Sequence, residues 1–451
     1  GDKKLSATKR LLRYFPKIIS YSKVRKVVNR ARRYVQGKHS LAGRANRELV
    51  MIAAMAAVRG NPKTAISRWH KFSQYFSAEE NDHVWTVLAT WAARWHREDA
   101  LALYRATTGK YADEHARAWF VRAALRNNDY AKVLRGVDAM PPAEAQLSAW
   151  RYWRAIALQQ QQQHAAATAE LVALATEEED FYGLLAREEV GHELVQSQPP
   201  PATATAANAP FAGDFALALA VRQAGLASLA RGLWRHAARV EEVSETQLIV
   251  AAHKAAQAKW PLASIDAANR IDTAATAHHL RFPFPYKQEI LSHSKKRGLD
   301  PAFVYGLIRQ ESRFMPRIVS SAKAQGLMQV IPRTARAVAR AHGYHKYHVS
   351  RLKRVDTNMT IGTTYLANLA DNLNAAPAMV AAAYNAGPSR VKKWYRSSEE
   401  LLIAIENIPI TETRLYVKYV LANRLHYRHR LGLEVPPMTH SISQSIHSAA
   451  L

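Results

Sequence analysis

The chain has 451 residues, 48% of them apolar, which is enough hydrophobic material for a packed core and excludes an intrinsically disordered chain. Lysine and arginine number 63 against 36 aspartate and glutamate, and the formal charge of +27 favours a polyanionic partner: nucleic acid, an anionic membrane or an acidic cell-wall polymer. The chain has no cysteine, which excludes disulfides, thiolate metal sites and a cysteine nucleophile.

The N-terminal segment from Lys3 to Arg33 is the most basic stretch, and we interpret most of its charges as a solvated surface. No uninterrupted apolar run reaches the roughly 20 residues that a membrane-spanning helix needs, so we expect no transmembrane segment. The chain begins at Gly1 without a recognisable secretory signal, which is compatible with a signal that has been removed. The closely spaced basic residues are Arg25, Lys26, Arg30, Arg32 and Arg33.

The first 190 or so residues are predicted to form helix after helix, interrupted at intervals of about 31–37 residues. This interval is typical of helix-hairpin repeats, in which each pair of helices buries its apolar face against the next pair. Tryptophans such as Trp85 and Trp119 lie at helical spacing from other apolar residues, and we favour core packing for them over ligand stacking. The predicted breaks are Gly60-Asn61-Pro62, the segment 96–99, Asn127-Asn128-Asp129 and the glutamine run 159–163.

Two proline-rich segments divide the rest of the chain. Residues 196–210 are rich in Pro, Ala and Thr without periodicity, which predicts a linker. Residues 211–282 are predicted to form a second, smaller helical unit, and the prolines at 283 and 285 mark its end. We therefore expect an all-α protein with domains at 1–195, 211–282 and 283–451. In the second unit we expect one apolar side made of Leu217, Val221, Leu226, Leu229 and Leu233.

The third domain contains a helix that begins with Asp300 as N-cap and Pro301 at the first helical position. Its apolar stripe predicts that the helix ends near Glu311, ahead of Pro316. A carboxylate beside apolar neighbours and the negative end of a helix dipole should have a raised pKa, which suits a proton donor. Taken alone, however, Glu311 would be interpreted as an ordinary surface acid. The expected stripe is Phe303, Val304, Leu307 and Ile308.

Four short motifs follow in order over about 110 residues: a Glu-Ser-x-Phe string at Glu311, then Ser320 with a Gly-Leu-Met-Gln string, then Ala-Ala-Tyr-Asn-Ala-Gly-Pro at 382–388, then Ile-Pro-x-Thr-Glu-Thr at 408–413. Together they resemble the catalytic domain of the lytic transglycosylases, in the group similar to goose lysozyme. The resemblance covers residues 286–430. Upstream, weaker similarity at 181–191 and 281–283 implies an N-terminal ring of helix hairpins and a helical linker domain before a lysozyme-like catalytic domain.

The resemblance implies a role for each matched residue. Glu311 corresponds to the single catalytic acid/base, Ser320 to a hydroxyl that orients the N-acetyl group of the substrate, and Gln329 to a groove residue. Tyr384 corresponds to a tyrosine whose hydroxyl lies near the catalytic carboxylate, and Glu412 to a second acid that binds substrate. Met328 is expected either to pack against a sugar face at the groove wall or to belong to the core, and Tyr365, in an N-x-x-x-G-x-x-Y-L pattern from Asn358, to be structural.

Two positions depart from the family pattern. Lys323 stands where the family usually has a glycine, so that the turn or the groove could differ there. Ile331 stands where a methionine is common. Neither change removes a chemical group that the reaction needs.

The resemblance implies non-hydrolytic cleavage of the β-1,4 bond between N-acetylmuramic acid and N-acetylglucosamine, with 1,6-anhydromuramoyl products and without a metal or cofactor. A hydrolytic muramidase is the alternative, with Glu412 as the candidate second carboxylate. A third interpretation, from the charge and the repeats, is a non-enzymatic helical scaffold or nucleic-acid binder; we expect no nucleic-acid partner. The expected partners are peptidoglycan strands and, at the helical ring, other cell-wall enzymes, for a monomer in the Gram-negative periplasm, with association with the outer membrane left open.

Overall fold

The computed structural model describes residues 19–192, 211, 213–239, 243–271, 274–344, 348–374, 376–395 and 400–447. Throughout these ranges the regular elements are helices, accompanied by isolated β-bridges and no strand, which confirms the all-α prediction. The predicted linker at 196–210 and the first part of the basic N-terminal segment lie outside these ranges. None of the helices in the described ranges is both long and apolar enough to cross a bilayer.

The chain divides by its internal contacts into two compact units. Unit 1 comprises Gly1–Glu170 together with Glu406–Pro409, and unit 2 comprises Leu171–Ile405 together with Ile410–Leu451. The finer division into domains at 1–195, 211–282 and 283–451 stays a prediction.

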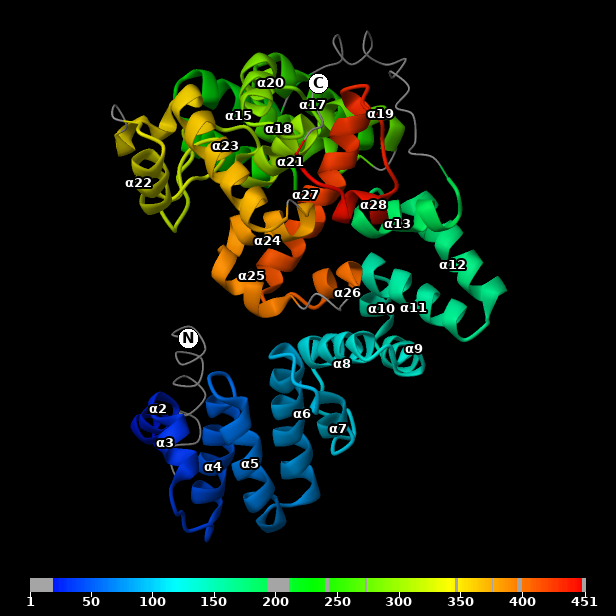
Figure 1. Cartoon of the computed structure of the whole chain (residues 1–451), viewed down its shortest axis with the longest axis vertical. Helices are drawn as coiled ribbons and strands as arrows, with labels where there is room; N and C mark the ends of the chain where they lie inside the picture. The colour runs from blue at the N-terminus through cyan, green and yellow to red at the C-terminus, as the bar shows by residue number, and fades with distance from the viewer. Residues whose placement is uncertain are drawn as a thin grey trace. The chain divides into compact units, whose positions relative to one another are not determined.

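Neighbouring helices of unit 1 contact one another, and α4, α5 and α6 lie side by side (Figure 1). All four predicted breaks fall at junctions between consecutive helices, although Pro62 already belongs to α5 and the first two residues of the glutamine run still belong to α11. The helices are α2 (Tyr21–Asn29), α3 (Ala31–Gln36), α4 (Arg44–Ala57), α5 (Pro62–Phe72), α6 (Ala78–Arg94), α7 (Ala100–Tyr104), α8 (Glu114–Arg126), α9 (Tyr130–Asp138), α10 (Pro142–Ala145) and α11 (Ser148–Gln160), with the 3₁₀ helix η1 (Ser73–Tyr75); α12 (His164–Glu177) continues into unit 2.

Local chemistry explains where these helices start. Asn61 caps α5 by accepting a hydrogen bond from the backbone N–H of Thr64, and Pro62 occupies the first helical position. At the next-but-one break, Asn128 adopts a left-handed conformation (φ +52°) that ends one helix, and Asp129 caps the following one. The break at 127–129 therefore combines a residue that ends one helix with a residue that starts the next.

Tryptophans fill the core of unit 1, as predicted. Trp69 and Trp119 are completely buried, and Trp85 is buried with Leu88 one turn away. The glutamine run at 159–163 ends α11 and lies largely exposed, so it has no part in this core.

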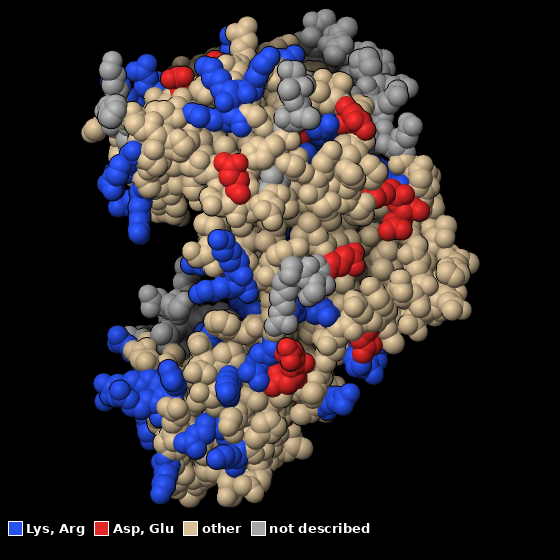
Figure 2. Space-filling model, viewed as in Figure 1, with Lys and Arg blue, Asp and Glu red and all other residues tan. Residues whose placement is uncertain are grey.

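The basic residues of α2 and α3 lie at the surface, which confirms the expected solvated face. Figure 2 shows Lys and Arg side chains spread over the visible side of the molecule, with several gathered over these first helices. Between them, Val24 and Val27 point inward and are buried, so the charged and apolar faces of α2 alternate with the helical period. The exposed residues are Arg25, Lys26, Arg30, Arg32 and Arg33.

A buried ion pair anchors residues 406–409 within unit 1. The guanidinium of Arg122 in α8 lies 2.8 Å from Oε1 of Glu406, and its Nε also donates to the backbone oxygen of Glu406 at 3.1 Å. The guanidinium lies over the rings of Trp119 and Trp150, at 5.2 and 5.0 Å from their centroids. Because both charges are desolvated, their mutual neutralisation is what makes this burial tolerable.

Unit 2 contains the remaining helices and the short segments between them. They are α13 (Phe181–Glu189), α15 (Asp214–Gln223), α16 (Ala227–Ala237), α17 (Glu245–Gln257), α18 (Pro261–Ala268), α19 (Ala274–Arg281), α20 (Lys287–Lys296), α21 (Pro301–Ser312), α22 (Pro332–Ala341), α23 (Val355–Asn372), α24 (Pro377–Ala386), α25 (Pro388–Trp394), α26 (Leu401–Glu406), α27 (Thr411–Arg430) and α28 (Met438–Ser443), with the 3₁₀ helix η2 (Val349–Lys353).

The predicted apolar side of the second helical unit is confirmed for Val221 and Leu233, which pack partly buried against the core, and is wrong for its other three residues. Leu217, Leu226 and Leu229 are about half exposed, whereas Phe215 and Trp234 are buried. The aromatic residues and a set of alanines let α15–α18 approach closely, and the buried face is therefore offset from the leucines. The helix α19 ends at Arg281, directly before Phe282-Pro283, and the domain boundary predicted there stays a prediction.

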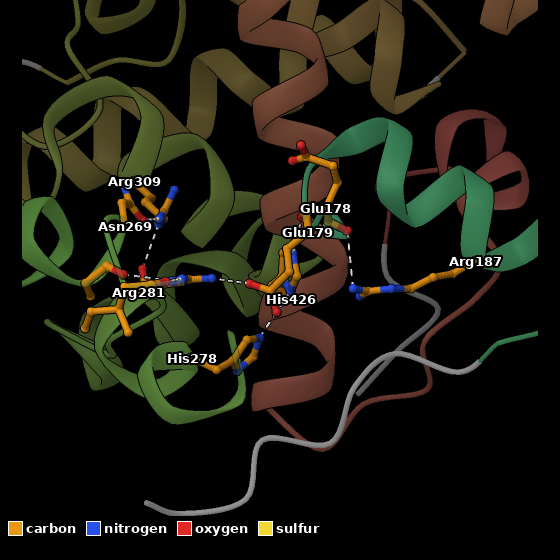
Figure 3. A network of polar contacts seen from close by, with 10 residues as sticks. Glu178, Glu179, Arg187, Asn269, His278, Arg281, Arg309 and His426 are labelled. Carbon is orange, nitrogen blue, oxygen red and sulfur yellow. Dashed lines mark hydrogen bonds and ion pairs between the residues drawn. The ribbon is translucent and has the colours of Figure 1, made fainter. Parts of the chain in front are cut away.

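A network of polar contacts joins four elements of unit 2 (Figure 3). Arg281 of α19 forms an ion pair with Glu179, and its backbone oxygen accepts a hydrogen bond from Nε of Arg309 in α21 at 2.9 Å. His278 and His426 share a hydrogen bond of 3.1 Å, and the other ring nitrogen of His426 lies 3.1 Å from the backbone oxygen of Glu179. These contacts fix α21 and α27, the two helices that form the candidate site, against the helices before them.

Candidate functional site

The helix α21 is buried along most of its length and carries an acid in its last turn. Asp300 accepts a hydrogen bond from the backbone N–H of Ala302 and Pro301 follows it, as predicted. The predicted apolar stripe is completely buried, and Gly306 lets α27 pass so closely that a β-carbon there would lie 3.0 Å from the backbone oxygen of Val420. Glu311 occupies the last turn, and Arg313 beyond it adopts a left-handed conformation (φ +48°) that terminates the helix.

The carboxyl group of Glu311 has the raised pKa that its position predicts. Burial raises the pKa of Glu311 to about 7, and the negative charge of Glu412 adds to the rise. The hydroxyl of Tyr416 opposes the rise by donating a hydrogen bond of 2.6 Å to Oε1. At neutral pH the side chain is therefore poised between the acid and the carboxylate, the condition for donating and then accepting a proton.

Glu311 faces a cleft of about 700 Å³ within unit 2. The cleft collects residues that are up to about 100 positions apart in the sequence, from α21, the 318–331 loop, α24 and α27. Five of the six residues singled out from the sequence line it: Glu311, Ser320, Gln329, Tyr384 and Glu412.

The 318–331 loop forms one wall of the cleft. The hydroxyl of Ser320 accepts a hydrogen bond from the backbone N–H of Ala324 at 3.1 Å, and the side-chain amide of Gln329 donates to the backbone oxygen of Gly326 at 2.9 Å. Lys323 adopts a left-handed conformation (φ +64°), so this chain keeps a glycine-like turn at its departure from the family pattern. The side chain of Lys323 is exposed and does not line the cleft.

Met328 does not line the cleft, which corrects the alternative of a sugar contact. Its side chain is completely buried and packs so tightly on α23 that a β-carbon on Gly362 would lie 2.3 Å from its sulfur. Its backbone does serve the site: the oxygen of Met328 accepts a hydrogen bond from the hydroxyl of Tyr384 at 2.8 Å. Sequence motifs alone do not separate a side chain at the wall from one directly behind it.

The direct partner of the acid is Tyr416, which lies three residues after the last of the four motifs and had no predicted role. The hydroxyl of Tyr384 is committed to Met328, whereas that of Tyr416 reaches the carboxylate. Tyr416 lies on α27 one turn after Glu412, and the helix turns its ring toward α21. That placement follows from the close packing of two helices about 105 residues apart, which the sequence pattern does not contain.

The comparisons with known proteins agree on one family. Residues 288–407 match the family model of the Transglycosylase SLT domain. The soluble lytic murein transglycosylase of Salmonella typhimurium is 29% identical over 330 residues, covering 71% of this chain and 50% of that protein. A putative soluble lytic murein transglycosylase of Haemophilus influenzae is 31% identical over 283 residues, covering 62% of this chain and 46% of that protein.

Solved structures share the fold. The inactive Glu→Gln mutant of the lytic transglycosylase Slt from Pseudomonas aeruginosa superposes with a TM-score of 0.82 at 26% identity, over 98% of this chain and 73% of that chain. The 70-kDa soluble lytic transglycosylase of Escherichia coli superposes with a TM-score of 0.73 at 23% identity, over 92% of this chain and 67% of that chain.

The helical fold and the acid in its cleft, with these matches, define an SLT-domain protein. Residues 288–407 form a Transglycosylase SLT domain, and the chain as a whole is similar to soluble lytic murein transglycosylases. It spans about half the length of the curated relatives that it matches.

Proposed function

We propose that this protein is a peptidoglycan lytic transglycosylase. It would cleave the β-1,4 bond between N-acetylmuramic acid and N-acetylglucosamine and close a 1,6-anhydro ring on the muramoyl product. The observation that carries the proposal is Glu311: a carboxyl group with a pKa near 7, hydrogen-bonded to Tyr416 and facing a cleft in an SLT domain.

In the first step, protonated Glu311 donates its proton to the glycosidic oxygen, and the bond to C1 of the muramoyl residue breaks. The N-acetyl group of that residue stabilises the positive charge that develops at C1. In the second step, the Glu311 carboxylate accepts the proton of the C6 hydroxyl while this hydroxyl attacks C1. An internal nucleophile has a high effective molarity, so one carboxyl group serves as acid and then as base without consuming water.

Four other cleft residues have proposed supporting roles. Ser320 would orient the N-acetyl group, Gln329 would hydrogen-bond the glycan, and Glu412 would bind the substrate from the first turn of α27. Tyr384 would hold the wall at Met328 in place. The proposal follows from their position around one cleft and from the resemblance of their motifs.

A hydrolytic muramidase is the second candidate, because Glu412 is an exposed carboxylate in the same cleft as Glu311. In that reaction Glu412 would activate water on the opposite face of the sugar. We favour the transglycosylase because its reaction requires only Glu311, the acid whose pKa is raised by burial.

The cellular location of the protein and its binding partners are also proposals. We place the protein in the periplasm of a Gram-negative bacterium, because similar proteins of Salmonella typhimurium and Escherichia coli are named murein transglycosylases. The basic surface would retain peptidoglycan, whose stem peptides carry free carboxylates, and raised salt would then weaken retention. The helices of unit 1 would hold the glycan or a second cell-wall enzyme, and the protein would act as a monomer, without nucleic acid.

The products decide between the two reactions. Purified sacculi are digested with the full chain, and the soluble fragments are analysed by mass spectrometry. We expect muramoyl ends 18 Da lighter than reducing ends, because water is not added during ring closure. Predominantly reducing muramoyl ends would establish the muramidase instead, and sacculi left intact would exclude both enzymes.

We expect Tyr416→Phe to shift the pH profile of cleavage upward. The hydroxyl of Tyr416 stabilises the charged form of Glu311, so its removal raises the pKa of Glu311 further above its ordinary value. The acid form then persists to higher pH, and the alkaline limb of kcat/KM should move up by about one pH unit. Tyr384→Phe is the matched control, because its hydroxyl donates to Met328 and not to the acid. An unmoved alkaline limb in Tyr416→Phe would contradict the role assigned to this hydroxyl.

A further inference from the structure

The helix α27 is buried along most of its length and opens to solvent on one stripe. From Thr411 to Tyr427, all of which the structure describes, the exposed positions are Thr411, Glu412, Leu415 and Tyr419. The last three follow the i, i+3, i+7 spacing of one helix face, and they extend over about 10 Å along the axis. All three line the cleft that holds Glu311. The stripe therefore forms the floor or a wall of this cleft, and we call it the α27 stripe.

Beyond Glu412, the side chains of the α27 stripe are apolar. Glu412 stands at its start, but Leu415 and Tyr419 follow, with 43% and 47% of their surface exposed. Ile331, which lines the same cleft from the start of α22, is 46% exposed. The fold gains little from apolar side chains that stay this open, because the transfer of their surface out of water is only half complete. Their concentration at one cleft marks a surface that a ligand covers.

The chemistry of the cleft selects the ligand. A pyranose ring presents C–H groups on its two faces and hydroxyl groups around its edge, so it packs its face against an aromatic or branched aliphatic side chain. The first residue of the stripe, Glu412, can accept hydrogen bonds from the hydroxyl edge. A stripe that is longer than one sugar ring and continuous with the catalytic cleft fits a neighbouring ring of the same strand.

We propose that Leu415 and Tyr419, with Ile331, form a platform for the face of a sugar ring of the bound glycan, next to the bond that is cleaved. The occupant is a pyranose ring of the strand itself and not its stem peptide. This inference rests on the proposed function, since it takes the glycan as the ligand of the cleft. It adds a binding site that sets how the strand is held, beyond the residues that carry out the chemistry.

The test uses the full-length Glu311→Gln variant, so that bound strands stay uncut. Two probes are compared by binding titration: intact sacculus fragments, and strands of alternating N-acetylmuramic acid and N-acetylglucosamine from which an amidase has removed the peptides. We expect Tyr419→Ala to weaken binding of both probes by about five- to tenfold, the loss of one aromatic contact. Tyr419→Phe keeps the ring and should restore the affinity. Leu415→Ala should act in the same direction with a smaller loss.

The matched controls are Leu217→Ala and Leu229→Ala, which remove exposed leucines of unit 2 that do not line the cleft. They should leave binding to peptide-free strands unchanged. The proposal is overturned if Tyr419→Ala binds both probes normally, if it loses affinity only for fragments that carry peptides, or if peptide-free strands do not bind the parent variant. Failure of the proposed function would show itself separately, as reducing ends or no products from the wild-type chain.

Discussion

Replacing Glu311 with glutamine should abolish the cleavage of sacculi while leaving the fold and the binding of glycan intact. The amide cannot donate a proton to the glycosidic oxygen or accept one from the C6 hydroxyl, so both steps lose their catalyst. We expect kcat to fall at least about 10³-fold, the range for removing a general acid/base. The change preserves the shape of the side chain and removes a partly buried charge, so the thermal melting temperature should not fall. Release of soluble muropeptides measures the loss.

Two further variants accompany Glu311→Gln: one is a control at an acid outside the cleft, and the other tests the second acid of the cleft. Glu434→Gln removes an exposed acid that does not line the cleft, and it should keep full activity. Glu412→Gln changes the second acid of the cleft, and in a transglycosylase it should lower kcat/KM by about tenfold or less, the loss of one binding contact. A loss with Glu412→Gln as large as that with Glu311→Gln would favour the muramidase. Normal lysis by Glu311→Gln would refute the assignment of the acid.

The place of the acid on its helix could be predicted because the evidence for it is local, whereas its role came from the resemblance of four motifs. Asp300 and Pro301 fix where α21 begins, and the helical period then fixes that Glu311 lies in the last turn. The breaks between the helices of unit 1 are local in the same sense, since each contains its own capping or left-handed residue. Features that a few consecutive residues determine could be read directly from the chain.

Features that depend on packing between distant segments could not be predicted from the sequence. Leu217 and Leu229 follow a helical period, but the alanines of neighbouring helices allow closer contact, so the face with Phe215 and Trp234 is buried instead. Tyr416 has no local property that identifies it as the partner of Glu311, because the contact requires α27 to pack on α21 at Gly306. The buried pair of Arg122 and Glu406 likewise joins positions 284 residues apart.

Asn358 is an example of both kinds of feature. The sequence pattern that contains it could be recognised, but its contacts with the loop before α22 could not be predicted. Its side chain accepts a hydrogen bond from the backbone N–H of Met328 and donates to the backbone oxygens of Gln325 and Leu352, each at 2.8 Å. Gly326 (φ +80°) lies against it so closely that a β-carbon there would be 2.2 Å from its amide nitrogen. One buried amide on α23 therefore holds the loop that carries Ser320 and Gln329.

We expect Asn358→Ala to release this loop and to inactivate the enzyme although it touches no cleft residue. Three backbone groups lose their partner at a cost of about 1–3 kcal/mol each, so the local opening free energy should fall by at least about 3 kcal/mol. Hydrogen exchange in the segment 318–330, followed by mass spectrometry on the full chain, should then accelerate by on the order of 10²-fold. Cleavage of sacculi should fall with it, because the loop no longer holds the substrate-binding side chains in place.

Two substitutions on the same helix separate this anchoring from a general loss of α23. Asn372→Ala lies at the exposed end of α23 and should change neither exchange in 318–330 nor activity. Asn358→Asp keeps the oxygen that accepts from Met328 but loses both donations, and its charge faces two backbone oxygens, so it should resemble Asn358→Ala. If exchange in this loop stays protected in Asn358→Ala while activity is lost, Asn358 acts on the reaction by another route. If both are unchanged, the loop is held by its own turn and by the packing of Met328 on Gly362.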